Sequence, residues 1–335
     1  MYSLIQKIMN ILIVNNSKIP VFEYGGTERV IWYLGKELVK LGHSVSYLVQ
    51  EGSYCDFAKV YFIDPNKPFN DQIPDFIDIV HFNFDPQQKI EKPYLVTMHG
   101  NCNDDRLLDI NTVFVSKNHA LRFGSDSFVY NGLDWDDYGK VNFNTKRTHF
   151  HFLGNAAWRV KNVQGAIDII KKAKGERLMV MGGVRFNMNM GVRLTFHPRI
   201  RFAGMVGGAQ KNVLLQQSKG LIFPVRWHEP FGLAIIESLY FGCPVLATPY
   251  GSLSELVHKD VGTLSINSAD LTKAVTSIEQ FDPKKCHQYA LDSFNSKVMA
   301  IHYLDNYEKV LNGHSLNQKK PQLIEIQKEK FLPFN

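Results

Sequence analysis

The stretch Phe223-Pro-Val-Arg-Trp-His-Glu-Pro-Phe-Gly-Leu-Ala-Ile-Ile-Glu237 decides the fold. Its first residues predict the end of a buried strand, and the apolar run after Gly232 predicts a helix that carries Glu237. Glycine at the helix start leaves backbone N–H groups open to a polar ligand, while the loop carboxylate of Glu229 can accept hydrogen bonds from hydroxyls. Two solvated glutamates would show the same spacing.

The same succession of strand and helix patterns extends over the chain. Short apolar runs rich in Val, Ile and Phe alternate with segments of helical periodicity, which is typical of parallel sheets covered by helices. The alternation stops in the polar stretch 131–148, which resembles a linker, and restarts at His149. We predict strands at 10–14, 44–49, 59–62, 79–82, 94–98, 112–116, 128–129, 149–153, 177–181, 200–202, 220–223 and 244–247, and helices at 27–41, 163–173, 208–218, 231–241 and 253–257.

We therefore expect an α/β protein of two doubly wound halves, because 335 residues suit two domains. The first domain is predicted at 1–140 and the second at 148–298. A late helix at about 299–315 follows a region without further strands, so we expect it to cross back onto the first domain. The lysine-rich segment 316–335 is predicted to be a peripheral tail.

The composition of the chain limits the classes of protein and of partner that are possible. The contents of 44% hydrophobic and 21% charged residues exclude whole-chain disorder, collagen and coiled coil. A net charge of +6 leaves an anionic substrate, a membrane surface or nucleic acid as partner. The four cysteines lie far apart without a C-x-x-C pair, which disfavours a zinc site and predicts a reduced cytoplasm. No apolar window of membrane-spanning length occurs, and Met1–Ile8 is interpreted as a short extension or an alternative translation start.

A resemblance gives these residues a role. Glu229–Glu237, followed by Gly242-Cys-Pro-Val-Leu-Ala-Thr248 and Gly251-Ser-Leu-Ser-Glu-Leu-Val257, resembles the EPFGLxxxE signature of the retaining family four glycosyltransferases. The resemblance implies the GT-B fold, in which two facing Rossmann-like domains enclose a cleft. It implies that Glu229 is catalytic beside the donor sugar, that the backbone of Phe231, Gly232 and Leu233 contacts sugar hydroxyls, and that Glu237 holds the nucleotide ribose.

The first strand is followed by Tyr24-Gly-Gly-Thr-Glu-Arg29, just before a predicted helix. Adjacent glycines at a helix N-terminus allow a phosphate to approach, although a tight turn uses the same residues. In the resembling family this loop closes over the donor diphosphate and the acceptor. We therefore assign Gly25 and Gly26 to donor binding, and Arg29 can add charge there.

His99 ends another predicted strand, in Val96-Thr-Met-His-Gly-Asn101. A lone histidine is more often a structural hydrogen-bonding group. The family, however, places a histidine after this strand, facing the donor sugar across the cleft. The resemblance thus implies that His99 is catalytic.

The segment Phe152–Val163 departs from the family pattern. An arginine normally follows the glycine directly, but Asn155 occupies that position, and Arg159 and Lys161 come later. We expect Lys161 and Arg159 to neutralise the donor diphosphate, with a solvated basic loop as the alternative. Ser252 and Glu255 fit a helix capping box, so we interpret Glu255 as structural.

The sequence thus predicts a retaining hexosyltransferase that uses a nucleotide diphosphate sugar of the UDP- or GDP-hexose type. We expect a glycan or glycolipid acceptor, a role in surface polysaccharide or lipopolysaccharide synthesis, and a cytoplasmic location at the inner face of the membrane with peripheral membrane contact. No cofactor or metal is expected, and no nucleic-acid partner is expected.

Two alternatives share this architecture: a sugar-nucleotide epimerase and a non-catalytic nucleotide-sugar binder. A phosphorylase would need a pyridoxal lysine setting and usually a longer chain. An NAD dehydrogenase is disfavoured because no G-x-G-x-x-G fingerprint follows either opening strand.

Overall fold

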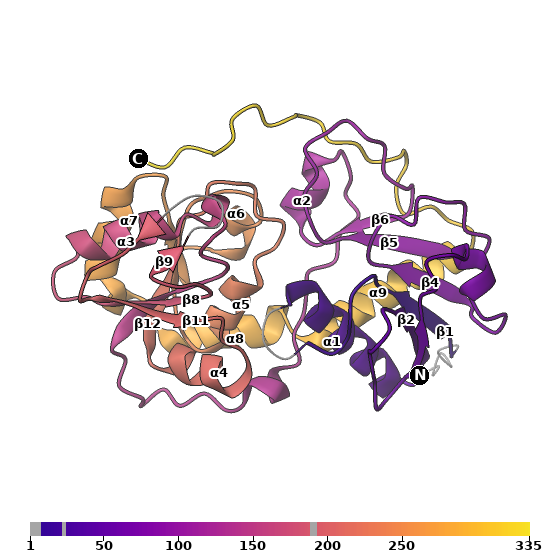
Figure 1. Cartoon of the computed structure of the whole chain (residues 1–335), viewed down its shortest axis with the longest axis horizontal. Helices are drawn as coiled ribbons and strands as arrows, with labels where there is room; N and C mark the ends of the chain where they lie inside the picture. The colour runs from indigo at the N-terminus through magenta and orange to yellow at the C-terminus, as the bar shows by residue number, and fades with distance from the viewer. Residues whose placement is uncertain (1–7, 22–24, 188–192) are drawn as a thin grey trace, which may run out of the picture. The chain divides into compact units, whose positions relative to one another are not determined.

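The computed structural model describes residues 8–21, 25–187 and 193–335. They form two compact units, each built on one six-stranded sheet (Figure 1). The first unit comprises the described residues up to 133, without 22–24, together with 296–326. The second comprises the described residues of 134–295 and the terminal stretch 327–335.

The first sheet is parallel throughout, with the strand order β3-β2-β1-β4-β5-β6. Helix α9 packs against α1 in this unit, so the late helix belongs to the first unit. The elements are β1 (Asn10–Val14), α1 (Gly26–Lys40), β2 (Ser44–Val49), β3 (Lys59–Phe62), the 3-10 helix η1 (Phe69–Gln72), β4 (Ile79–Phe82), β5 (Tyr94–Met98), β6 (Thr112–Phe114), α2 (Lys117–Arg122) and α9 (Ser296–Leu311).

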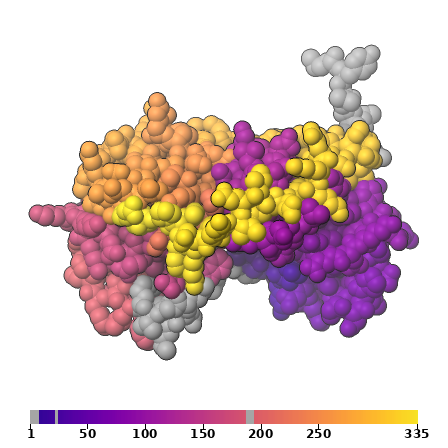
Figure 2. All heavy atoms as spheres, turned by 90° about the horizontal axis from the view of Figure 1, so that it is seen from above, coloured from indigo at the N-terminus to yellow at the C-terminus, as the bar shows by residue number. Residues whose placement is uncertain are grey.

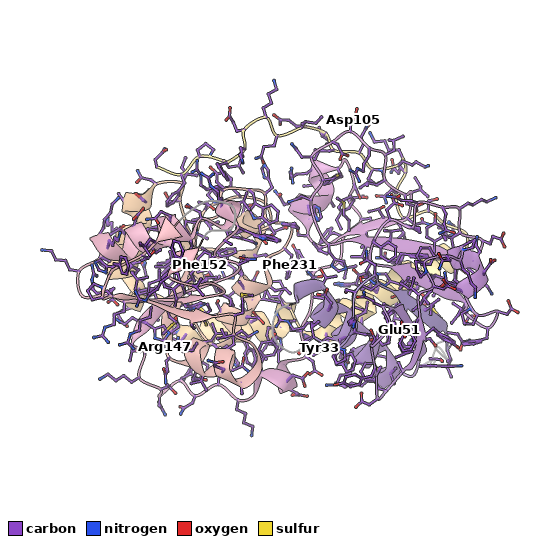
Figure 3. The ribbon with its side chains drawn as sticks, in the orientation of Figure 1. Tyr33, Glu51, Asp105, Arg147, Phe152 and Phe231 are labelled. Carbon is purple, nitrogen blue, oxygen red and sulfur yellow. The ribbon has the colours of Figure 1, made fainter. Side chains whose placement is uncertain are left out.

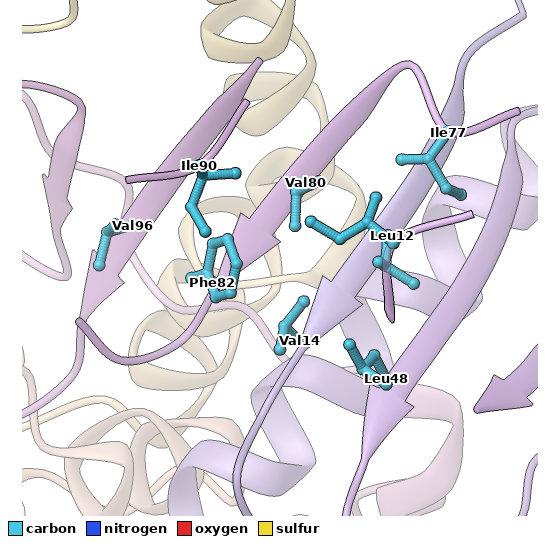
Figure 4. Close-up of a cluster of buried hydrophobic side chains, with 9 residues drawn as sticks. Leu12, Val14, Leu48, Ile77, Val80, Phe82, Ile90 and Val96 are labelled. Carbon is cyan, nitrogen blue, oxygen red and sulfur yellow. The ribbon is translucent and has the colours of Figure 1, made fainter. Parts of the chain in front are cut away.

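One face of this sheet carries a cluster of buried aliphatic and aromatic side chains (Figure 4). Alternate residues of each strand point to the same face, so Leu12 and Val14 of β1 meet Val80 and Phe82 of β4. The alternate residues Ile11 and Ile13 of β1 are buried as well, which explains why this strand appears in the sequence as a continuous apolar run.

The second sheet is also parallel, in the order β11-β8-β7-β12-β13-β14. Helices α5 and α8 pack together, as do α3 and α7. The elements are η2 (Trp135–Tyr138), β7 (His149–Leu153), η3 (Arg159–Lys161), α3 (Val163–Lys172), β8 (Leu178–Met181), β9 (Phe186–Asn187), β10 (Arg193–Leu194), β11 (Ile200–Gly204), α4 (Gly208–Gln216), β12 (Ser218–Phe223), α5 (Leu233–Tyr240), β13 (Val245–Ala247), α6 (Leu253–Leu256), β14 (Gly262–Leu264), α7 (Ser268–Thr276), η4 (Ile278–Gln280) and α8 (Pro283–Ser293).

Several segments differ from the sequence prediction. The strand predicted at 128–129 is a single bridge between Phe128 and Phe114. The segment predicted as a linker holds buried aromatic residues, because Trp135 stacks on Tyr240 of α5 with ring centres 4.4 Å apart. Strand β14 was missed, because its three residues, Gly-Thr-Leu, form no apolar run.

The segment expected to be a peripheral tail instead forms backbone hydrogen bonds with the rest of the chain at several points (Figure 2). In the first unit, the Gln322 N–H donates to the Phe123 carbonyl at 3.0 Å, and Leu323 is buried. In the second unit, the Leu332 N–H donates to the Arg226 carbonyl at 2.9 Å. Apolar residues interspersed among lysines thus anchor a stretch whose composition resembles that of a solvated tail.

Helix α1 crosses its sheet at a glycine. The Tyr47 hydroxyl of β2 donates to the Ile31 carbonyl at 3.2 Å. A Cβ atom on Gly35 would lie 2.0 Å from that hydroxyl oxygen, which is far inside van der Waals contact. The close approach of helix and sheet therefore requires glycine at this position.

We predict that Gly35→Ala lowers the free energy of unfolding by about 1–3 kcal/mol, measured by urea denaturation, although alanine is the better helix former. Combining it with Tyr47→Phe should restore part of the loss, because the clashing oxygen is removed. Gly100→Ala, where a Cβ meets nothing within 4 Å, is the control. A neutral Gly35→Ala would contradict the packing account.

Candidate functional site

Three loops gather at the carboxyl edge of the second sheet. Strands β7, β12 and β13 are parallel neighbours, so the segments that follow them emerge at the same edge. The loop after β7 carries Lys161, the loop after β12 carries Glu229, and the turn after β13 carries Gly251. Ligands of open α/β sheets bind at this edge.

Glu229 is buried and held in place by two donors. The Lys161 Nζ atom lies 2.9 and 2.6 Å from its two carboxylate oxygens, and the Trp227 indole N–H donates to Oε2 at 2.8 Å. The same ammonium group lies 4.8 Å from the Trp227 ring centre and 5.3 Å from that of Phe223. Because a desolvated charge is costly without a partner, the two groups stabilise each other as an ion pair.

Neighbouring backbone ties the Lys161 loop to the Glu229 loop. The Asn162 side chain caps α3 by accepting from the Gly165 N–H at 3.1 Å, and its amide donates to the Pro224 carbonyl at 2.9 Å. The Arg226 N–H donates to the Val160 carbonyl at 2.7 Å. The position of the ammonium group is thus fixed by bonds on both sides of Lys161.

Gly251 allows the third loop to approach. Its φ is +64°, and a Cβ there would lie 2.3 Å from the Glu229 carbonyl oxygen. The Ser252 N–H donates to that same oxygen at 2.9 Å. A glycine is required here by both conformation and space.

Helix α5 begins directly beside the carboxylate. Gly232 is its N-cap residue, with φ 87°, and no side chain caps the helix. A Cβ on Gly232 would lie 3.3 Å from the Glu229 Cγ, so the glutamate stem packs on this residue. The predicted donor residues Gly232 and Leu233 therefore place helix N-terminal N–H donors next to Glu229.

The Phe231 side chain belongs to the core of the second unit (labelled in Figure 3). It is buried, and its ring centre lies 6.0 Å from that of Phe294. Its carbonyl accepts from the Ser252 hydroxyl at 2.6 Å. Only the backbone of Phe231 can therefore contact a ligand, and the predicted capping box is wrong, because Ser252 bonds to this carbonyl and makes no side-chain cap.

Glu237 lies further along α5 in a second buried ion pair. Its Oε1 accepts from the Lys211 ammonium of α4 at 2.5 Å and from the Tyr138 hydroxyl of η2 at 2.6 Å. The ammonium also lies 5.1 Å from the Tyr138 ring centre. Lys211 and Tyr138 could not be linked to Glu237 from the sequence, because neither stands at a spacing that indicates a contact with it.

Arg159 has partners other than the Lys161–Glu229 pair. Its side chain is exposed, and its guanidinium carbon lies 5.1 Å from the ring centre of Phe331, in the terminal stretch. Arg226 lies 5.2 Å from the same ring. The Asn155 side chain, at the family's arginine position, accepts from the Ala157 N–H and closes a local turn.

His99 follows β5 in the first unit and is oriented by Asn83, which follows β4. The Asn83 amide group donates to the Val14 carbonyl at 3.1 Å, which leaves its oxygen as acceptor for His99 Nε2 at 2.8 Å. The proton therefore sits on Nε2, and Nδ1 is the acceptor nitrogen of the ring. Burial lowers the pKa of His99 to about 4, so the imidazole is neutral at physiological pH.

Gly25 and Gly26 begin α1 in the first unit, and Tyr24 lies outside the described residues. A Cβ on Gly25 would lie 2.6 Å from Val21 Cγ2 and 2.8 Å from Glu28 Oε2. The Arg29 Nε–H donates to the Gly25 carbonyl at 3.1 Å. The crowding of this loop by its own side chains is thus a structural reason for glycine at position 25.

Comparison with known proteins places this arrangement in a known architecture. Residues 147–281, which contain the three loops, match the family model described as "Glycosyl transferases group 1". AviGT4, a glycosyltransferase involved in avilamycin A biosynthesis, is 18% identical with a TM-score of 0.73, covering 91% of this chain and 98% of its own. The fold is GT-B.

Other solved structures agree on the GT-B fold. A glycosyltransferase from Rickettsia africae is 15% identical, with a TM-score of 0.71 and coverage of 91% and 99% of the two chains. Anabaena HepE, solved in complex with UDP-glucose, is 16% identical, with a TM-score of 0.65 and coverage of 91% and 100%.

One curated relative is similar over a shorter stretch. It is an uncharacterized 41.2 kDa protein in the cps region of Klebsiella pneumoniae, 27% identical over 114 residues. The match spans about a third of each chain, since it covers 32% of both.

We predict that Lys211→Met lowers the free energy of unfolding by about 3–5 kcal/mol, because it leaves Glu237 buried with its ion-pair partner removed. Adding Glu237→Gln should recover much of that loss. Lys219→Met is the matched control, since the Lys219–Glu176 pair in the same unit is more exposed and should cost about 1 kcal/mol or less. Equal costs at both lysines in urea denaturation would refute the prediction.

We predict from the lowered pKa of His99 that its ring stays neutral at pH 5, as measured by NMR titration of 15N-labelled histidines, with the proton on Nε2. The folded value lies below the ordinary 6.5, so this group's contribution to stability is present above pH 6.5 and is lost as the pH falls toward 4. Asn83→Asp should raise the pKa of His99 by about 1–2 pH units, because a carboxylate favours the imidazolium. Asn70→Asp, on η1, should leave it unchanged.

Proposed function

We propose that this chain is a retaining glycosyltransferase that moves a sugar from a nucleotide diphosphate donor to a hydroxyl acceptor. The observation that supports the proposal is the buried Lys161–Glu229 pair beside the N-terminus of α5, at the carboxyl edge of a GT-B domain. A cation, a carboxylate and helix N–H donors within one small region match the three needs of this reaction: to bind phosphate, to orient hydroxyls and to stabilise developing charge.

The donor would exchange partners with this pair. A diphosphate oxygen can draw the Lys161 ammonium away from Glu229 and neutralise its leaving charge there. The released carboxylate then accepts hydrogen bonds from sugar hydroxyls, with the Trp227 indole still fixing Oε2. Binding the donor and positioning the sugar are thereby coupled through one side chain.

The anomeric configuration is retained because the leaving group departs from, and the acceptor attacks, the same face of the sugar. In the proposed reaction the bond from the anomeric carbon to the leaving phosphate breaks, and the acceptor oxygen attacks from the same face. The leaving phosphate oxygen takes the acceptor proton, so Glu229 orients the sugar and forms no covalent bond. Lys161 and the α5 N-terminus stabilise the diphosphate, and we propose that no metal or cofactor is needed.

Further residues have supporting roles in the proposal. Glu237 accepts hydrogen bonds from the ribose hydroxyls while it remains paired with Lys211. Neutral His99 exchanges hydrogen bonds with a hydroxyl of the sugar, and the loop of Gly25 and Gly26 borders the donor. Arg159 contributes positive charge near the diphosphate once its contact with Phe331 loosens.

We propose a UDP- or GDP-hexose donor and a glycan or glycolipid acceptor in bacterial surface polysaccharide synthesis, in the cytoplasm at the inner face of the membrane. HepE carries UDP-glucose in its structure, and the curated relative comes from a cps region, which favours this setting. None of the helices among the described residues is long and apolar enough to cross a bilayer.

The deciding experiment combines a donor screen with one isosteric change. A thermal-shift screen against UDP, GDP, ADP and their sugars should show a rise in melting temperature with one nucleotide. Release of that nucleotide from its sugar donor should then fall about 10²–10³-fold in Glu229→Gln. Glu255→Gln, a carboxylate on α6 in the same motif region, should retain near wild-type turnover.

A folded Glu229→Gln with full turnover would contradict the assignment, as would a product of inverted anomeric configuration. Epimerised donor formed without acceptor would favour the epimerase. Nucleotide binding without turnover of any donor would favour the non-catalytic binder.

A further inference from the structure

A two-stranded ribbon replaces a helix in the second unit. Strands β8 and β11 are parallel neighbours, and such a pair is usually joined through a crossover helix. In the described part of the connection, 182–187 and 193–199, the chain forms no helix and instead forms the antiparallel pair β9–β10. Phe186 and Leu194 stand opposite each other in this pair.

The ribbon turns its apolar face outward. Phe186 and Leu194 share one face because they are cross-strand partners, and Phe196, two residues beyond Leu194, continues that face. Their exposed fractions are 52%, 53% and 82%. Thr195, which alternates to the other face, is buried. A two-stranded ribbon on a protein surface normally has the reverse arrangement, so we call these three residues the ribbon face and regard it as a binding surface.

Positive charge lies beside the ribbon face. The sequence from Arg177 to Met205 contains five arginines and no aspartate or glutamate. Arg185 and Arg201 are exposed, and the Arg185 guanidinium donates to the Thr195 carbonyl at 3.3 Å, which places it at the base of the ribbon.

We propose that the ribbon face and its flanking arginines dock on the surface of an anionic lipid bilayer. The three apolar side chains enter the boundary between headgroups and acyl chains, while Arg185 and Arg201 bind lipid phosphates through their guanidinium groups. Exposed apolar side chains with an exposed arginine at their base match that interface on both counts. A second copy of this chain fits less well, because a two-fold contact would bring each arginine-rich surface against its own like charge.

The ribbon starts at the same sheet edge as the candidate site. A Cβ on Gly182, directly after β8, would lie 2.1 Å from the Gly154 carbonyl oxygen, which follows β7 and begins the loop that carries Lys161. Docking would therefore bring that edge of the second unit toward the membrane. The consequence that a lipid-linked acceptor is met there rests on the proposed function, but docking itself does not.

Vesicle flotation with the full chain tests the proposal. We expect flotation with vesicles that contain phosphatidylglycerol and phosphatidylcholine, and little with phosphatidylcholine alone. The combined variant Phe186→Ser, Leu194→Ser and Phe196→Ser should lower the bound fraction about tenfold or more. Arg185→Gln with Arg201→Gln should weaken binding and flatten its salt dependence.

Matched controls separate the ribbon face from general hydrophobicity. Leu121→Ser, of 52% exposure in the first unit, and Ile324→Ser, of 71% exposure in the terminal segment, should leave flotation unchanged. Circular dichroism and the melting temperature verify that each variant is folded. Turnover of a donor in free solution should be unaffected by the ribbon variants, so that failure of docking and failure of the proposed activity give different results.

Three results would overturn the proposal. The first is absence of flotation with either vesicle, and the second is flotation that the triple variant does not reduce. The third is a dimer, seen by light scattering, that the triple variant dissociates while flotation is unchanged, which would make a second copy the occupant.

Discussion

The ion pair between Lys161 and Glu229 is the interaction on which the candidate site depends. Two buried charges in contact with aromatic rings must be matched closely, since either alone would strongly destabilise the fold. The match requires the loops after β7 and β12 to keep a fixed separation, and the bonds from Asn162 and Arg226 supply it. The parallel order of the strands brings these loops together, and glycine at 251 lets the third loop close over them.

Much of the strand pattern could be predicted from the sequence, for a physical reason. Strands of a parallel sheet are buried on both faces, so Asn10–Val14 appears as an apolar run with the bounds that the structure shows. The predictions failed for segments that are held in place by single buried side chains within a polar stretch of sequence. Trp135 anchors the stretch predicted as a linker, and Leu323 helps to anchor the segment predicted as a tail, and neither belongs to a periodic pattern.

The candidate site was predictable only in part. Glu229 and Lys161 came from a resemblance, and their direct pairing could not be foreseen because they stand 68 residues apart. Tyr138 and Lys211 lie 99 and 26 residues from Glu237 in the sequence, and only the fold brings them into contact with it. Trp227 lies within the stretch that drew attention first, but no spacing rule assigns an indole to a carboxylate. The roles of these residues in catalysis stay predictions.

The ring of Phe331 has an electrostatic consequence. Arg159 and Arg226 come from the two loops that also carry Lys161 and Glu229. Their guanidinium carbons lie 5.1 and 5.2 Å from the centre of the Phe331 ring. Like charges held near each other repel, but the electron-rich faces of a ring offset part of that repulsion. A single phenylalanine far along the chain thus lets the second unit concentrate positive potential close to its carboxyl edge, where an anionic molecule would be attracted before it makes any specific contact.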